Sequence, residues 1–245
     1  MKVLKLFELL FLSGALSAYV KWKIFSLSAF KIVKRLQYMG VKPSSIIDIG
    51  ANVGQFSIAA SEILKPEKLI VIEANMELKK ELEKNLSYYQ NKEIIFNGIG
   101  DFNGLLEFNL NIDSQTSSFL NLGSDRIREF PNNLYKSKNR IKVITLDKLM
   151  KKKFIPEPVL LKIDVQGYEK EVLNGAKQIL SNFKWVVIET SFANLYEGEA
   201  TFNTIVKLMS ENNYTFVKPL NFHETKDKFN IIEMDALFEN NKELN

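Results

Sequence analysis

Short runs of apolar residues alternate with stretches of helical periodicity through most of this 245-residue chain. The runs "SIIDIG", "KLIVIEA" and "VLLKID" are apolar at nearly every position, as in strands that are buried on both faces of a sheet. Repeated strand and helix units of this kind predict an α/β fold with a doubly wound, mostly parallel sheet. The expected strands are residues 45–50, 68–74, 93–100, 159–164, 185–190, 214–218 and 229–238, and the expected helices are residues 55–64, 76–86, 169–180 and 202–213.

Two segments depart from this pattern. No helical period separates the last two expected strands, which predicts an antiparallel hairpin at one edge of the sheet. Residues 104–112 alternate apolar and polar side chains like a half-exposed hairpin arm, and residues 113–139 are rich in Ser, Asn, Gly and Pro, which indicates a long loop before a strand at 141–146. We therefore expect one domain over residues 41–245, with residues 101–140 forming a hairpin and a loop on the substrate side.

Residues 1–40 form a separate N-terminal segment with early lysines and an apolar middle. Glu8 interrupts the apolar run, which is shorter than the roughly 20 residues that a spanning helix needs. We expect this segment to be helical and packed on the domain. The alternative is weak attachment to a membrane surface through its large apolar side chains, namely Phe7, Leu10, Phe11 and Trp22.

The composition excludes several classes of function. The chain has no cysteine, so it has no disulfide framework, no thiolate metal site and no thiol nucleophile, and it fits the reducing cytoplasm. The net charge is +4, but the lysines are interleaved with acids, so no nucleic-acid partner is expected. Nothing in the composition indicates an oligomeric state.

The stretch "IIDIGANVGQFS" at residues 46–57 places an acid and two glycines between a strand and a helix. In a parallel sheet, ligands bind outside the carboxyl ends of the strands, where Gly50 and Gly54 let a ligand approach bare backbone. Dinucleotide-binding loops usually have Gly-x-Gly-x-x-Gly, but this loop has Asp48 just before its first glycine. Because an acid repels a pyrophosphate and attracts a cation, the loop favours a cationic amino-acid nucleotide over NAD.

Glu73 ends the next expected strand, 23 residues after Gly50. An acid at this distance accepts hydrogen bonds from both ribose hydroxyls in dinucleotide folds. Taken alone, it is equally explained as a helix cap. The glycine loop and the acid on consecutive strands together are more specific for a nucleoside.

The motifs "IIDIGANVGQFS", "VIEAN" and "LLKIDVQGYEKEVLNGA" resemble the S-adenosylmethionine-dependent methyltransferases of the FkbM family. The resemblance covers about residues 38–238. It implies a Rossmann-like class I methyltransferase domain with a seven-stranded sheet, and methyl transfer to a hydroxyl oxygen of a sugar, glycan or small natural product. It also implies which residues hold the methionine part of the cofactor, namely Asp48, Gly50, Asn52 and Gly54.

By the same resemblance, Glu73 binds the ribose of the cofactor and Asp101 lies near its adenine. The motif around Asp101 is short, and a turn-forming Asp-x-x-Gly explains it nearly as well. A cofactor with a sulfonium and an ammonium agrees with an acid beside the glycine loop.

Asp164 and Glu189, at the ends of neighbouring expected strands, are the candidate catalytic residues. A hydroxyl acceptor benefits from a base that takes its proton, and Asp164 is our first candidate for a base or orienting group. The two carboxylates could instead hold a divalent cation, but the sequence shows no further clear ligand, so we assign no metal. We expect the only histidine, His223, to be a solvent-exposed residue of a polar loop.

Substrate contacts are expected in residues 112–139, where Ser117 and Ser118 are the candidates and Thr116 and Phe119 flank them. The sequence does not identify the acceptor. Three other functions compete with an O-methyltransferase. A base-amine nucleic-acid methyltransferase is disfavoured because Asp164 is followed by Val-Gln-Gly and not by a proline-rich turn. An NAD-dependent oxidoreductase is disfavoured by the glycine spacing, and a non-catalytic cofactor-binding scaffold is left open.

Overall fold

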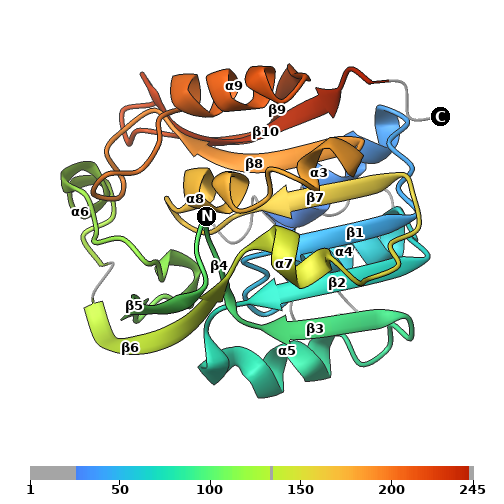
Figure 1. Cartoon of the computed structure of the whole chain (residues 1–245). Helices are drawn as coiled ribbons and strands as arrows, with labels where there is room; N and C mark the ends of the chain where they lie inside the picture. The colour runs from blue at the N-terminus through green and yellow to red at the C-terminus, as the bar shows by residue number, and fades with distance from the viewer. Residues whose placement is uncertain (1–25, 133–134, 243–245) are drawn as a thin grey trace.

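The computed structural model describes residues 26–132 and 135–242, and its centre is a seven-stranded sheet (Figure 1). The strand order is β3-β2-β1-β7-β8-β10-β9, and β10 alone runs antiparallel to the other strands of this sheet. The strands are β1 (Ser45–Ile49), β2 (Lys68–Glu73), β3 (Lys92–Phe96), β7 (Val159–Ile163), β8 (Trp185–Ser191), β9 (Tyr214–Glu224) and β10 (Ile231–Asn240). The predictions of a mostly parallel α/β sheet and of an antiparallel hairpin at its edge are both confirmed.

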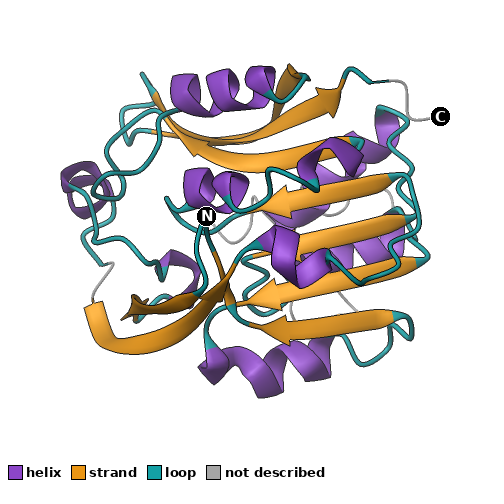
Figure 2. Cartoon of the chain, viewed as in Figure 1, coloured by secondary structure: helices purple, strands orange, loops and turns teal. Residues whose placement is uncertain are grey.

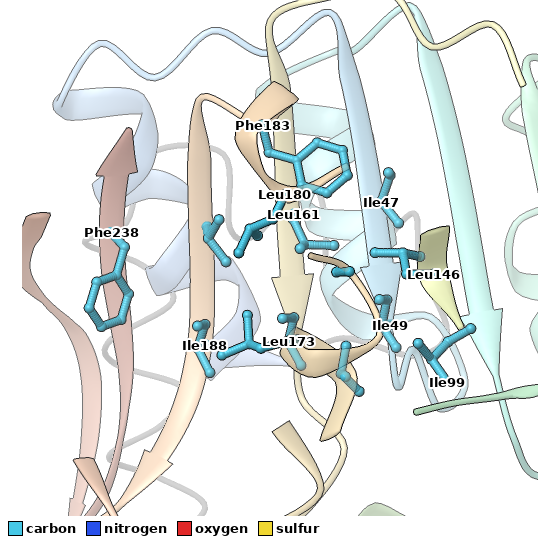
Figure 3. Packing of buried hydrophobic residues seen from close by; sticks show 14 of the residues in the cluster. Ile47, Ile49, Ile99, Leu146, Leu161, Leu173, Leu180, Phe183, Ile188 and Phe238 are labelled. Atoms are coloured by element: carbon cyan, nitrogen blue, oxygen red, sulfur yellow. The ribbon is translucent and has the colours of Figure 1, made fainter. Parts of the chain in front are cut away.

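Helices cover both faces of the sheet, as in a doubly wound fold (Figure 2). Successive strand residues point to opposite faces, so Ile46 packs in one apolar cluster and Ile47 in the other. The first cluster includes α3 (Leu27–Tyr38), α4 (Gln55–Ile63) and Leu82 of α5 (Lys79–Asn85). The second includes α7 (Leu146–Met150), α8 (Glu169–Asn174) and α9 (Phe202–Glu211), and Figure 3 shows part of it.

A second, three-stranded sheet lies beyond the carboxyl ends of the main strands (Figure 1). It consists of β4 (Gly98–Ile99), β6 (Tyr135–Ile144) and β5 (Gly104–Asn111), in that order. The prediction of one strand over residues 93–100 is therefore wrong, because Asn97 separates β3 from β4. The predicted loop over residues 113–139 is also wrong in part, since it contains a 3₁₀ turn (Ser114–Thr116), α6 (Ser124–Glu129) and the start of β6. Most residues of β6 are exposed and polar, so the strand lacks the apolar pattern that identifies buried strands.

Two other boundaries differ from the sequence prediction. Helix α8 ends at Asn174 and not near Leu180, because Gly175 lies against the backbone of Gly100: a Cβ at Gly175 would lie 1.9 Å from the carbonyl oxygen of Gly100. Strand β9 continues to Glu224, well past residue 218. His223 therefore lies in a strand of the sheet and not in a loop.

Helix α3 is the described part of the predicted N-terminal helical segment. It packs on α4 and β9, where the Asn221 amide donates to Ser28 Oγ over 2.9 Å and the Arg35 guanidinium donates to the Leu220 carbonyl. The rest of that segment, including the side chains predicted to contact a membrane, lies outside the described residues. Among residues 26–132 and 135–242, no helix is long and apolar enough to cross a bilayer.

Candidate active site

A cavity of about 510 Å³ opens at the carboxyl ends of β1, β2, β7 and β8. Strands β1 and β7 are neighbours although more than 100 residues separate them, so the chain reverses its winding direction between them. Crevices at such a switch point are the usual ligand sites of doubly wound sheets. The walls come from α3, the segment between β5 and α6, and the hairpin of β9 and β10.

Glu73 lies at the end of β2 and organises the loop that follows β1. Its Oε2 accepts from the backbone N–H of Asn52 and its Oε1 from that of Asn75, each over 2.7 Å. Only 6% of the residue is exposed, and burial raises the pKa of its carboxyl to about 7, although the two backbone bonds oppose this. The carboxylate lines the cavity on the side of β2, where the sequence predicted a ribose contact.

Asp48, on β1, is a second acid of the cavity wall. Its Oδ2 accepts a hydrogen bond of 2.6 Å from the Ser57 hydroxyl at the start of α4. Burial raises the pKa of Asp48 to about 6, and the bond from Ser57 counteracts only part of that shift. A buried carboxyl with a raised pKa favours a cationic ligand, since a positive charge nearby stabilises its ionised form.

Contacts within the protein explain why glycine occupies positions 50 and 54. Gly50 has a φ of +81°, and a Cβ there would lie 1.8 Å from the carbonyl oxygen of Asp164. Gly54 has a φ of +92°, and a Cβ there would lie 3.0 Å from Leu82. Close packing between the ends of β1 and β7 thus requires Gly50, whether or not a ligand is bound. Of the two glycines, Gly50 lines the cavity.

We predict that Gly50→Ala is much more destabilising than Gly40→Ala. Both glycines have φ near +80°, but a Cβ at Gly40 meets no atom within 4 Å. Backbone strain alone should cost Gly40→Ala about 1–2 kcal/mol, whereas Gly50→Ala adds overpacking and should cost about 3–5 kcal/mol. Thermal unfolding of both variants measures the difference. Equal losses of stability would show that the approach of Gly50 to Asp164 is not tight.

The part of the cavity beyond β2 and β3 is apolar. Ile72 and Ile99 line it together with Phe119, and the backbone of Asn97 and Gly98 follows β3 there. Asp101 is exposed and lies outside the cavity lining, so its adenine contact stays a prediction that the geometry does not favour. The cavity thus combines an apolar slot with two buried acids at consecutive strand ends. This combination of side chains fits a ligand with an adenine, a ribose diol and a cationic amino-acid chain.

The two serines predicted to contact substrate are both hydrogen-bonded within the protein. Ser117 Oγ lines the cavity and accepts from the backbone N–H of Asn111 over 3.0 Å. The Ser118 hydroxyl is fully buried and donates to the carbonyl of Gln166 over 2.6 Å, so it ties the inserted segment to the turn after β7. Ser117 stays a candidate for a substrate contact, whereas the position of Ser118 favours a structural role.

Asp164, at the end of β7, is held by a buried lysine from its own strand. Lys162 Nζ donates to Asp235 Oδ1 over 2.9 Å and to Asp164 Oδ2 over 3.3 Å. Burial lowers the pKa of this ammonium, but Asp164, Asp235 and Glu189 outweigh burial and raise it. The cation therefore stays charged and holds together the carboxylates of Asp164, directly after β7, and Asp235, within β10.

Gln166 joins the two predicted catalytic carboxylates. Its Nε2 donates to Asp164 Oδ1 over 2.9 Å and to Glu189 Oε2 over 2.5 Å, and its Oε1 accepts from the hydroxyl of Tyr196 over 2.7 Å. The residue has a φ of +58°, and Glu169 accepts from the backbone of residues 165 and 167 on either side of it. A strained turn thus holds this amide in place.

The carboxyls of Asp164 and Glu189 differ in ionisation. Burial raises the pKa of Asp164, but Lys162, Gln166 and Glu189 together lower it below its ordinary value. Burial and the charge of Asp164 raise the pKa of Glu189 well above its ordinary value. Asp164 therefore favours its ionised form, whereas Glu189 holds a proton more readily than an ordinary carboxyl.

A second polar cluster lies on the neighbouring strands β9 and β10. His223 and Glu233 are paired across the two strands, and Nδ1 of His223 is 2.7 Å from Oε1 of Glu233. The guanidinium of Arg126, from α6, donates to Glu233 Oε2 over 3.1 Å and lies 3.5 Å from Oε1 of Gln166. Its buried Nε has no hydrogen-bond partner among the described residues. All four residues line the cavity, so the two clusters face the same space.

The structure brings together Asp48, Gly50, Asn52, Glu73, Asp164 and Glu189 around one cavity. The sequence analysis did not identify Lys162, Gln166, Arg126, Tyr196, Glu233 or Asp235. A signal was present for three of them: Lys162 interrupts the apolar strand "VLLKID", and Glu233 and Asp235 interrupt "IIEMDALF". Within the described chain, no group of three or more His, Asp or Glu side chains is arranged to hold a metal ion.

The strand order and the cavity at the switch point define a Rossmann-like class I methyltransferase domain. Residues 48–216 match the model of the methyltransferase FkbM domain, which is more than half of the chain. The protein therefore belongs to the FkbM methyltransferase family. This confirms the resemblance on which the sequence analysis relied.

Three individual proteins are also similar to this chain. A curated relative, the 2-O-methyltransferase NoeI of Sinorhizobium fredii (strain NBRC 101917 / NGR234), is 24% identical over 191 residues, which are 74% of this chain and 78% of that protein. A solved structure of an uncharacterised protein from Listeria monocytogenes serotype 4b has a TM-score of 0.50 at 10% identity and covers 90% of this chain and 70% of that one, which supports the fold. The methyltransferase FkbM of Methylobacillus flagellatus KT has a TM-score of 0.47 at 15% identity, over 80% of this chain and 43% of that one.

Proposed function

We propose that this protein is an S-adenosylmethionine-dependent O-methyltransferase that acts on a hydroxyl of a sugar, glycan or small natural product. The observation that carries the proposal is the placement of four carboxyl groups around one cavity. Asp48 and Glu73 lie on the side of β1 and β2, and Asp164 and Glu189 lie on the side of β7 and β8. The named 2-O-methyltransferase among the relatives supports oxygen as the acceptor atom.

The proposed cofactor position follows from the charged and apolar side chains that line the cavity near β1 and β2. Asp48 attracts the cationic part of the cofactor, Glu73 accepts from the ribose hydroxyls, and the apolar slot at Ile99 and Phe119 takes the adenine. When bound, S-adenosylmethionine supplies an electrophilic methyl group to the acceptor. Asn52, whose backbone N–H is fixed by Glu73, shapes the loop against which the cofactor lies.

The acceptor side orients the reacting hydroxyl. The lowered pKa of Asp164 suits a group that accepts from the hydroxyl, and the raised pKa of Glu189 suits one that donates a proton to a neighbouring oxygen of the same molecule, so a vicinal diol such as that of a sugar fits the pair. Gln166 and Lys162 prevent both carboxyls from rotating away. Holding the oxygen in line with the methyl carbon supplies much of the rate enhancement.

Calorimetric titration with S-adenosylhomocysteine, and separately with NAD, tests the cofactor without knowledge of the acceptor. We expect binding in the micromolar range for S-adenosylhomocysteine alone. Binding of neither ligand would overturn the proposal. Transfer of label from S-adenosylmethionine to the acceptors of a cell lysate then distinguishes an enzyme from a binding scaffold, because a scaffold binds without transferring label.

The affinity for S-adenosylmethionine should fall as the pH is lowered from 8 to 5. The pKa values of Asp48 and Glu73 are raised to about 6 and about 7, so both acids gain protons in this range. Asp48 then loses its attraction for the cationic part of the cofactor, and Glu73 loses the charge that accepts from the ribose hydroxyls. We expect about tenfold weaker binding at pH 5, and proton release on binding near pH 6. Calorimetry in buffers of different ionisation enthalpy measures both quantities. A constant affinity between pH 5 and pH 8 would remove Asp48 from the cofactor site.

A further inference from the structure

His223 and Glu233 form a hydrogen-bonded pair that no part of the proposed mechanism uses so far. Glu233 is buried, with both oxygens engaged: Oε1 by Nδ1 of His223 and Oε2 by Arg126. A carboxylate in this position makes Nδ1 the protonated nitrogen of a neutral imidazole and leaves Nε2 as the acceptor. Among residues 26–132 and 135–242, Nε2 has no hydrogen-bond partner. His223 lines the cavity, and its side chain is 54% exposed.

By comparison, the carboxyls on the acceptor side are poor proton acceptors. Both oxygens of Asp164 already accept hydrogen bonds, from Lys162 and from Gln166, and Asp235 is bound to the same lysine. Lys162, Gln166 and Glu189 lower the pKa of Asp164, and a strongly stabilised carboxylate is a weak base. Oε2 of Glu189 already accepts from Gln166 over 2.5 Å, and burial raises the pKa of this carboxyl well above its ordinary value, which favours the protonated form.

The surroundings of His223 suit a base that works near neutral pH. The hydrogen bond to Glu233 raises the pKa of the imidazole; burial opposes that shift, and the charges of Glu233 and Asp235 on β10 add to it. Arg126, from α6, acts in the opposite direction. The cluster is continuous with the orienting pair, since the guanidinium of Arg126 also approaches Gln166. The histidine therefore belongs to the same polar wall as Asp164 and Glu189.

We propose that Nε2 of His223 is the general base of the methyl transfer, that Glu233 positions it, and that Asp164 and Glu189 orient the acceptor. This inference rests on the proposed function. In the step, a lone pair of the acceptor oxygen forms the new C–O bond, and the electrons of the breaking C–S bond pass to the sulfonium sulfur, which becomes neutral. The hydroxyl proton goes to Nε2, and the imidazolium later releases it to solvent at the open side of the cavity.

The first test is the titration of His223 by nuclear magnetic resonance in protein without a histidine tag. Because the chain has one histidine, its imidazole signals need no assignment. We expect a neutral state protonated at Nδ1 and a pKa that falls when Glu233 is changed to Gln. We also expect the pKa to be lower by several tenths of a unit with S-adenosylmethionine than with S-adenosylhomocysteine, because only the former places a positive charge before the imidazole.

Identical titration curves with the two ligands would overturn the proposal, since the imidazole would then not face the reacting centre. A neutral state protonated at Nε2 would also overturn it. If neither ligand binds, the proposed function fails, and the result is distinguishable from a failure of the base assignment. The titration does not depend on the identity of the acceptor.

The second test compares the rates of variants with labelled S-adenosylmethionine and a deproteinised lysate of the cells that make the protein. We expect His223→Asn to lower the rate of label transfer about 100-fold, with the Kd for S-adenosylhomocysteine changed less than twofold, and imidazole in the buffer to restore part of the rate. Lys218→Gln, an exposed change on the same strand, is the matched control and should keep the wild-type rate.

A rate for His223→Asn within threefold of the wild type would overturn the base assignment. Glu233→Gln should reduce kcat and shift the pH profile to lower pH without a change in cofactor affinity, whereas a purely structural role would affect affinity and rate together. If the wild-type protein transfers no label to the lysate, the magnetic resonance titration decides the proposal.

Discussion

Replacing Lys162 by Met should destabilise the fold by about 3–5 kcal/mol near pH 7.5, although the two side chains have similar volumes. Lys162 is 2% exposed and its ammonium is bound by Asp164 and Asp235, with Glu189 close by. Without the cation, the carboxylates of Asp164 and buried Asp235 keep their negative charge and lose their partner. Unfolding in denaturant measures the loss.

The pH dependence of this loss has a defined sign. The pKa of Lys162 is raised in the folded state, so its stabilising charge is fully present throughout the neutral range. In the Lys162→Met variant, the buried carboxylates lose their repulsion when they gain protons. The loss of stability should therefore shrink as the pH is lowered towards 4.

The matched control removes a charge from each side of the pair. Asp235→Asn in the Lys162→Met background should recover about 1–2 kcal/mol, because one of the two unpaired carboxylates is gone. If Lys162→Met is as stable as the wild type at every pH, the lysine does not compensate these acids. The double variant also separates two causes of lost activity. If it recovers stability but not activity, the activity depends on the charges and not on folding alone.

Replacing Glu73 by Gln should weaken the binding of S-adenosylhomocysteine about 100-fold, which corresponds to roughly 2.7 kcal/mol. An amide offers one acceptor oxygen where the carboxylate offers two, so the backbone N–H of Asn52 or Asn75 loses its partner. The same change removes the negative charge that accepts from the ribose hydroxyls in the proposed site. Calorimetry measures the affinity, and thermal unfolding shows that the variant is folded.

A comparison of two nucleosides separates these effects. Wild-type protein should prefer adenosine to 2′-deoxyadenosine about tenfold, and Glu73→Gln should reduce that preference to near one. Glu77→Gln, an exposed acid in the 3₁₀ turn after β2, is the control and should leave both affinities unchanged. An unchanged nucleoside preference in Glu73→Gln would mean that the residue acts on the loop alone and not on the ribose.

The positions of His223 and Asp101 show what short sequence motifs cannot predict. His223 lies in a stretch of polar residues, and only its pairing with Glu233 across β9 and β10 places it in the cavity wall. Asp101 follows a short motif, and the separation of β3 from β4 moves it to the surface. When a residue is assigned to a site from one short turn motif, its predicted position depends on where the neighbouring strands end. The local sequence determines those strand ends only weakly.

The amino-acid sequence by itself determined the fold class and the half of the cavity wall that we propose binds the cofactor. Apolar strands alternate with helices, and Asp48, Gly50 and Glu73 lie at the carboxyl ends of strands that are consecutive in the chain, so local order already places them at one edge of the sheet. Only the tertiary structure decided the other half, which we propose binds the acceptor. Lys162, Gln166 and Glu233 come from segments that the sheet order brings together, and their state depends on burial and on charges from other strands. Neither burial nor charge partners can be read from a single stretch of residues.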